Sequence, residues 1–234
     1  MNIKDIKQWK CDPLDETTAC RVLDHGFIRY VDHYGDDQRI VDSARVSYQN
    51  GTRKVRDNEG LINYLVRNKH TSPLEMVDFL FHVKAPIFVC REWVRHRLVS
   101  MNEMSLRYSE AIEDFYTPET FRGQDKINKQ GSVEAPELDQ EALRESYRGI
   151  CSMAYEEYKL QLEQGVAREH ARMVLPVSWY TTWYWKCNLR TLWNFIELRG
   201  DNTAQYEIRQ YVEPITHITR AVVPITYKAL MEHT

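Results

Sequence analysis

The densest cluster of chemically useful side chains lies between residues 95 and 108. Its members are three arginines, a histidine, a carboxylate, an amide and two serines: Arg95, His96, Arg97, Ser100, Asn102, Glu103, Ser105 and Arg107. Arginine presents a planar fork that matches phosphate and carboxylate oxygens, and serine and asparagine add neutral donors and acceptors. The cluster therefore suits a nucleotide or dinucleotide. A solvated loop with surface salt bridges is the alternative interpretation.

Further polar residues occur at helical spacing nearer the C-terminus. Arg168 and Arg172 are four residues apart, so they share one helix face, as do Arg190 and Asn194. Arg199 ends a predicted helix just before a glycine, where a cation is favourable. The sequence contains no metal-ligand spacing of His, Cys, Asp and Glu, no Gly-rich phosphate loop and no dinucleotide-binding fingerprint.

Composition and charge restrict the class of protein. The 234 residues carry 31 basic and 34 acidic side chains, a net charge of −3, which argues against a protein that coats nucleic acid. Five cysteines without a C-x-x-C pair argue against a disulfide scaffold and for a reducing cytoplasm. No apolar run is long enough to span a bilayer or to act as a signal peptide. We expect a soluble cytoplasmic protein with neither a membrane nor a nucleic acid as partner.

The elements that must position these residues are mainly helical. We predict one α+β domain over residues 1–234, rich in helices, with a small and mainly antiparallel sheet. Strands are expected at 26–31 and 77–83, and a strand or a buried extended piece at 179–185. Residues 98–108 and 117–135 are expected to be loops. Helices are expected at 37–47, 59–68, from 73 onward, at 86–97, 137–164, 168–175, 189–200 and through the C-terminal third, with interruptions at Pro214 and Pro224.

Arg95-His96-Arg97, seven further residues and Ser105 form a motif that resembles the signature of flavin-dependent thymidylate synthases. The resemblance continues through Asn102-Glu103 and Ser105-x-Arg107-Tyr108. Other blocks match in the same order at residues 44–47, 70–75, 81–89, 168–176 and 188–195, so the resemblance covers roughly residues 26–213. It implies that fold and a reaction in which dUMP becomes dTMP, with 5,10-methylenetetrahydrofolate as one-carbon donor and FAD reduced by NADPH. Family members are homotetramers whose active sites lie at subunit interfaces.

The resemblance also implies residue roles. Arg199 is the catalytic arginine beside the uracil ring, where a fixed cation favours the N3-deprotonated pyrimidine and raises electron density at C5. No cysteine attacks the substrate. The nucleotide-binding residues are Glu92, Trp93, Val94, Arg95, Glu103, Met104, Ser105, Leu106, Arg107, Arg172 and Arg199. The FAD-binding residues are Ser47, His70, Ser72, Arg95, His96, Arg97, Glu103, Asn188, Leu189, Arg190 and Asn194.

Two positions depart from the family pattern. Many members carry His where this chain has Thr203, and many carry Gln where it has Glu92. Glu92 brings an additional negative charge near the expected pyrimidine. Two other functions remain as alternatives: a nucleic-acid-binding module that uses the arginines on phosphates, and a catalytically silent flavin-binding homologue. The net charge opposes the first alternative, and the intact motif opposes the second.

Overall fold

A five-stranded antiparallel sheet forms the centre of the molecule. The computed structural model describes residues 19–46 and 57–233. The strands stand in the order β1 (Ala19–Val22), β2 (Gly26–Tyr34), β3 (Asp78–Pro86), β7 (Tyr180–Asn188) and β4 (Val99–Glu103). This confirms the predicted α+β class and the antiparallel sheet.

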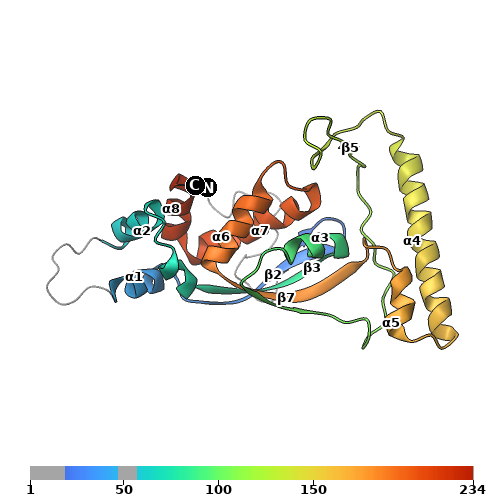
Figure 1. The fold of residues 1–234 in the computed structure, drawn as a ribbon, viewed down its shortest axis with the longest axis horizontal. Coiled ribbons are helices and arrows are strands. Elements are labelled where there is room, and N and C mark those ends of the chain that lie inside the picture. The colour runs from blue at the N-terminus through green and yellow to red at the C-terminus, as the bar shows by residue number, and fades with distance from the viewer. Residues whose placement is uncertain (1–18, 47–56, 234) are drawn as a thin grey trace.

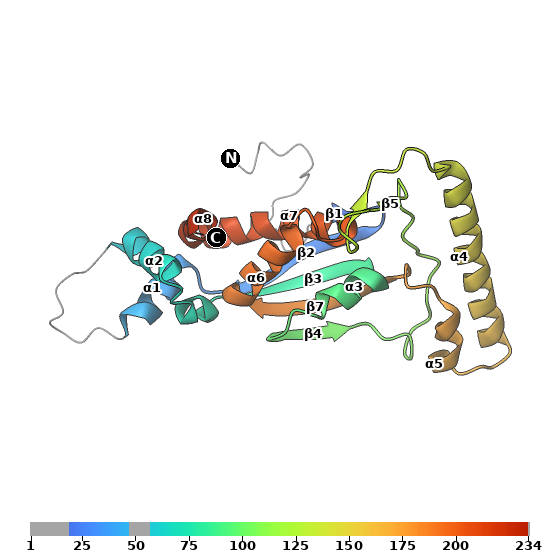
Figure 2. The ribbon, with the colours of Figure 1, turned by 45° about the horizontal axis from the view of Figure 1, so that its top comes forward.

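Helices cover one face of the sheet and extend beyond both of its ends (Figure 1). The covering helices are α3 (Ile87–Trp93), α6 (Leu189–Gly200) and α7 (Tyr206–Val222). Figure 2 shows two further groups, one at each end of the sheet. The first group is α1 (Asp37–Arg45), α2 (Asn58–Arg67), the 3₁₀ helix η2 (Ser72–Met76) and α8 (Pro224–His233). The second is α4 (Gln140–Glu163), α5 (Arg168–Ala171) and η3 (Arg172–Val174), preceded by the hairpin β5 (Gly123–Gln124) and β6 (Ser132–Val133).

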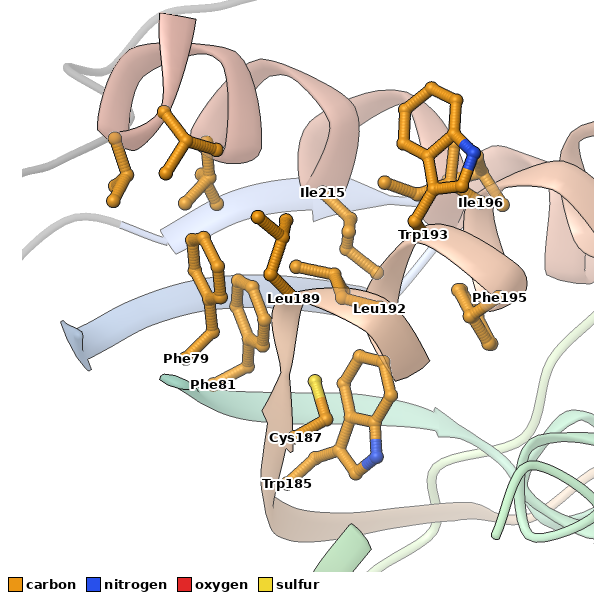
Figure 3. Close-up of a cluster of buried hydrophobic side chains, with 14 of the residues drawn as sticks. Phe79, Phe81, Trp185, Cys187, Leu189, Leu192, Trp193, Phe195, Ile196 and Ile215 are labelled. Atoms are coloured by element: carbon orange, nitrogen blue, oxygen red, sulfur yellow. The ribbon is translucent and has the colours of Figure 1, made fainter. Parts of the chain in front are cut away.

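Alternation along the strands builds the core beneath the helices. In β3 the side chains of Phe79, Phe81 and Val83 are buried, and their neighbours in sequence face the other side. Phe81 packs against Trp185 of β7 at 5.7 Å between ring centroids. Figure 3 shows residues of α6, among them Phe195, over these rings. The core therefore fixes α6 against β7, and α6 carries several of the predicted site residues.

Three details differ from the sequence-based predictions. Residues 99–103, expected within a loop, form the edge strand β4, because the backbone pairs with β7 while Val99 and Met101 pack against the core. Helix α7 continues through Pro214, since one missing backbone donor is outweighed by the buried apolar face of the helix. Strand β1 was not expected from the sequence. Among residues 19–46 and 57–233, no helix has the length and apolar character needed to cross a bilayer.

Candidate active site

Arg199 lies at the centre of a hydrogen-bonded cluster between α3 and α6. Its Nε donates to Nε2 of His96 at 2.9 Å, and its Nη1 reaches Oε2 of Glu92 at 3.3 Å. Its Nη2 donates to the main-chain oxygen of Glu92 at 3.4 Å. The side chains of Arg199 and Glu92 are 23% and 27% exposed, whereas His96 is only 5% exposed. The structure thus joins three of the predicted site residues.

Burial sets the protonation of this cluster. Desolvation, and then the Arg199 cation, lowers the pKa of His96 to about 4. The ring is therefore neutral at physiological pH and Nε2 can accept a hydrogen bond. Burial also raises the pKa of Glu92; Arg199 opposes that shift and Glu207 adds to it. The cluster is a cation flanked by one neutral acceptor and one carboxylate.

A cavity of about 540 Å³ opens beside this cluster. Glu92, Arg199 and Glu207 line it on one side, and residues of the 118–132 segment such as Phe121 and Arg122 line the other. Its volume lies within the usual range for small-molecule sites. A larger cavity of about 1160 Å³ between β1, the 116–136 segment and α7 shares Thr120 and Arg122 with it but is lined by no predicted site residue. Of these two cavities, only the smaller one is lined by predicted site residues, Glu92 and Arg199.

A second group of predicted residues lies at the end of β4. Met104 donates its backbone N–H to the main-chain oxygen of Thr182 in β7 at 2.9 Å, which anchors the start of the loop. Ser105 Oγ accepts from the backbone N–H of Arg107 at 3.2 Å. Leu106 is buried in a cluster with Tyr158 and other residues of α4 and α5, so this loop packs next to the segment that carries Arg172.

Two ion pairs of this second group join the start of α5 to the loop after β4. Glu169 pairs with Arg107 at 3.4 Å, and Arg168 pairs with Glu110 at 3.0 Å. Arg172 is exposed, and no ion pair holds its guanidinium among the described residues. Its charge is therefore open to a ligand.

A third group lies around η2 and the start of α6. Asn188 Oδ1 accepts from Thr191 N at 2.9 Å and so caps α6, and Leu189 is fully buried. Arg190 pairs with Glu75 of η2 at 2.5 Å. The predicted flavin residues His70, Ser72 and Asn194 are exposed in the same region, and Ser47 lies outside the described residues.

The second and third groups lie far apart within one chain. The backbone of Asn188 pairs with β3 at one end of β7, whereas Thr182 binds Met104 six residues further back along the strand. Six residues of a strand span about 20 Å. One chain therefore brings together His96, Glu92 and Arg199, and separately Ser105 and Arg107, but it does not unite all the predicted residues.

Comparison with known proteins decides the family. The family model described as thymidylate synthase complementing protein matches residues 29–225. A flavin-dependent thymidylate synthase of Thermus thermophilus is 55% identical over 212 residues, which cover 91% of this chain and 78% of the relative. This chain belongs to the flavin-dependent thymidylate synthase family. The enzyme of Wolbachia pipientis is 48% identical over 217 residues, covering 91% and 76% of the two chains.

Solved structures of the same fold agree with this assignment. The UMP/dUMP methylase PolB from Streptomyces cacaoi, bound with 5-Br UMP, is 35% identical and superposes with a TM-score of 0.80. The match covers 89% of this chain and 94% of that one. The fold of this chain is therefore shared by a protein whose solved structure holds a halogenated pyrimidine nucleotide.

Two residues that interact with predicted site residues were not assigned from the sequence. Glu75 lies within a recognised block, and its partner Arg190 lies 115 positions later, so only the fold reveals the pair. Glu207 on α7 lines the smaller cavity together with Glu92, and its charge helps to raise the pKa of that carboxyl. No sequence signal marks Glu207, because it lies in an ordinary amphipathic helix.

The donor groups around η2 and α6 fit a flavin dinucleotide by their chemistry. A dinucleotide presents a pyrophosphate, hydroxyl groups and ring edges that both donate and accept. Arg190, at the start of α6, is an exposed cation suited to the pyrophosphate, and Asn194 and Ser72 are exposed neutral groups suited to hydroxyls and ring edges. Arg97, which follows α3, is a further exposed cation.

Proposed function

We propose that this family member is an active thymidylate synthase that converts dUMP to dTMP. The one-carbon unit comes from 5,10-methylenetetrahydrofolate, and FAD, reduced by NADPH, supplies the redox chemistry when it is bound. The observation that carries the proposal is the Arg199 cluster beside the smaller cavity, in a chain 55% identical to a flavin-dependent thymidylate synthase.

For the nucleotide, we assign the phosphate to the exposed arginines. Arg172 and Arg107 flank the loop of Ser105, whose hydroxyl and neighbouring backbone donors suit a phosphate or a base edge. Arg199 is assigned to the uracil ring, where its charge stabilises negative charge that develops as C5 attacks the one-carbon unit. The remaining nucleotide residues in this proposal are Glu92, Trp93, Val94, Arg95, Glu103, Met104 and Leu106. Trp93 and Leu106 are only 1% and 7% exposed, so in this proposal they act through their backbone and by shaping the site.

For FAD, we assign the exposed groups around η2, α6 and the end of α3. His70, Ser72, Arg190 and Asn194 supply direct side-chain contacts in this proposal. Asn188 and Leu189 act by capping and anchoring α6, because the side chain of Asn188 is bonded to Thr191 and Leu189 is buried. The other members of the proposed FAD site are Ser47, Arg95, His96, Arg97 and Glu103.

We further propose a homotetramer with active sites at subunit interfaces. The support is the separation of about 20 Å, along β7, between the Ser105 loop, which we assign to the nucleotide, and the groups around η2 and the start of α6, which we assign to FAD. A second chain would bring complementary groups together. Light scattering should report four chains per particle. A stable and fully active monomer would refute this part of the proposal.

One set of assays separates the proposed enzyme from its alternatives. The purified protein should bind FAD saturably, and NADPH should bleach the flavin absorbance near neutral pH. With 5,10-methylenetetrahydrofolate present, dUMP should then yield dTMP. Flavin binding without product would indicate a silent homologue, and absence of flavin binding would refute the proposal. UMP is the matched substrate control, because the Streptomyces cacaoi relative is described as a UMP/dUMP methylase.

A further inference from the structure

The guanidinium of Arg199 is held at each of its three nitrogens. Nε donates a hydrogen bond to His96 Nε2, Nη1 donates one to the Glu92 carboxylate, and Nη2 donates one to the Glu92 main-chain oxygen. We infer that His96 and Glu92 are positioning residues for catalysis, which aim Arg199 into the smaller cavity. This inference rests on the role proposed above for Arg199, and it gives His96 a function beyond flavin contact.

The two acceptors are themselves rigidly placed. His96 lies three residues beyond the end of α3, and its backbone N–H donates to the main-chain oxygen of Trp93 at 3.0 Å. Its ring meets Phe195 edge to face at 4.9 Å, and Phe195 is fully buried against Trp93, with ring centroids 4.5 Å apart. The aromatic core thus fixes the direction in which Nε2 points. Glu92 lies in the last turn of α3, and both acceptors reach Arg199 of α6.

The chemistry of arginine makes this arrangement specific. Arginine has five N–H donors and no acceptor, so His96 can bond it only as a neutral imidazole with its proton on Nδ1. Three N–H groups are used by the two acceptor residues, which leaves two in the guanidinium plane for a ligand. Because Arg199 lines the cavity, these two donors have a fixed direction before the substrate arrives.

A kinetic test compares two substitutions of His96 in the FAD-loaded enzyme. His96→Leu removes the acceptor, whereas His96→Gln keeps an acceptor oxygen close to the position of Nε2. His96→Leu should lower kcat by about 10-fold to 100-fold, the scale for losing one charge-assisted hydrogen bond, with a smaller change in dUMP KM. His96→Gln should recover most of that loss. Equal activity of the two variants, or an effect confined to FAD affinity, would overturn the inference.

A double-mutant cycle tests whether His96 acts through Arg199. If it does, His96→Leu combined with Arg199→Ala should be no slower than Arg199→Ala alone. Additive losses would contradict the inference. The same comparison applies to Glu92→Gln, which keeps an oxygen acceptor, and Glu92→Leu, which does not. Circular dichroism and the flavin spectrum show whether each variant is folded and loaded.

A spectroscopic readout keeps the inference separate from the proposed function. In ¹⁵N-histidine-labelled protein, the His96 signals, identified by their absence from His96→Gln, should show an unprotonated Nε2 at neutral pH. Arg199→Ala should shift the Nε2 resonance. A protonated Nε2 at neutral pH, or no response to Arg199→Ala, would overturn the positioning role even if the enzyme turns over. Failure of wild-type turnover with the expected spectrum would instead refute the proposed function alone.

Discussion

Removing Arg199 and removing Ser105 should impair this enzyme in different kinetic parameters. Arg199 has all three guanidinium nitrogens bonded and is 23% exposed, so its charge is preorganised. Loss of one preorganised electrostatic group lowers kcat by about 10²-fold to 10³-fold, or about 2.7–4 kcal/mol. Arg199→Ala should therefore reduce kcat on that scale while FAD stays bound.

Ser105 is expected to contribute only binding. Its Oγ accepts one local hydrogen bond, from the Arg107 backbone at 3.2 Å. No histidine hydrogen-bonds this hydroxyl in the part of the chain that the structure describes, so it has no base to activate it as a nucleophile. A neutral hydrogen bond contributes about 0.5–1.5 kcal/mol, so Ser105→Ala should raise the dUMP KM by about 2-fold to 10-fold and keep turnover.

Steady-state kinetics of both variants, with the flavin spectrum and circular dichroism as controls, decide between these roles. An inactive Ser105→Ala enzyme that still binds dUMP, together with normal turnover of Arg199→Ala, would reverse the two assigned roles. In that case Ser105 would have to be considered as the nucleophile.

Three further predictions address protonation, cysteine chemistry and packing. The pKa of His96 is lowered to about 4 in the folded protein from its ordinary value of 6.5, so the unfolded chain takes up a proton first as the pH falls. The free energy of unfolding should therefore fall by about 3 kcal/mol between pH 6.5 and pH 4. Urea denaturation of His96→Gln should lack this part of the pH dependence. Replacing all five cysteines by serine should leave synthase activity in folded protein, because burial raises the pKa of the Cys90 thiol to about 12 and so disfavours a reactive thiolate. Each buried serine hydroxyl should cost about 1–3 kcal/mol of stability, so activity is measured on folded protein. Loss of turnover in folded protein would indicate a thiol mechanism. Gly26→Ala should destabilise the protein by about 1–3 kcal/mol, because the new Cβ would lie 2.2 Å from Tyr211 Oη. Gly149→Ala, in open space on α4, should stabilise the protein by about 0.5–1 kcal/mol. Equal melting temperatures of the two variants would contradict this prediction.

The elements with strong hydrophobic periodicity were predictable from the sequence. The alternation from Val77 to Val83 marks β3, and the apolar spacing from Leu189 to Ile196 marks α6, because burial on one face dictates both patterns. Strand β4 was missed because it lies at the sheet edge, where its residues are polar or only partly buried by the core. Its pairing with β7 comes from backbone hydrogen bonds, which leave no mark in the sequence.

The long helix α4 illustrates a different limit. Its apolar spacing marks the helix, but Leu143 and Ile150 are 39% and 57% exposed, whereas Cys151 and Tyr158 are buried. Helical spacing identifies the helix, but it does not tell how much of the apolar face the rest of the chain covers. Likewise, the pairing of Arg190 with Glu75 depends on how η2 meets α6.

Thymidylate synthesis by this protein can be followed through the product of one reaction. The purified, FAD-loaded protein is incubated without oxygen with NADPH, 5,10-methylenetetrahydrofolate and dUMP, and nucleotides are separated by chromatography. We expect dTMP formation that requires all three additions and falls about 10²-fold or more in Arg199→Ala. Flavin that NADPH bleaches without any dTMP, or dTMP formation that is unchanged when FAD is removed, would show that the protein is not a flavin-dependent synthase.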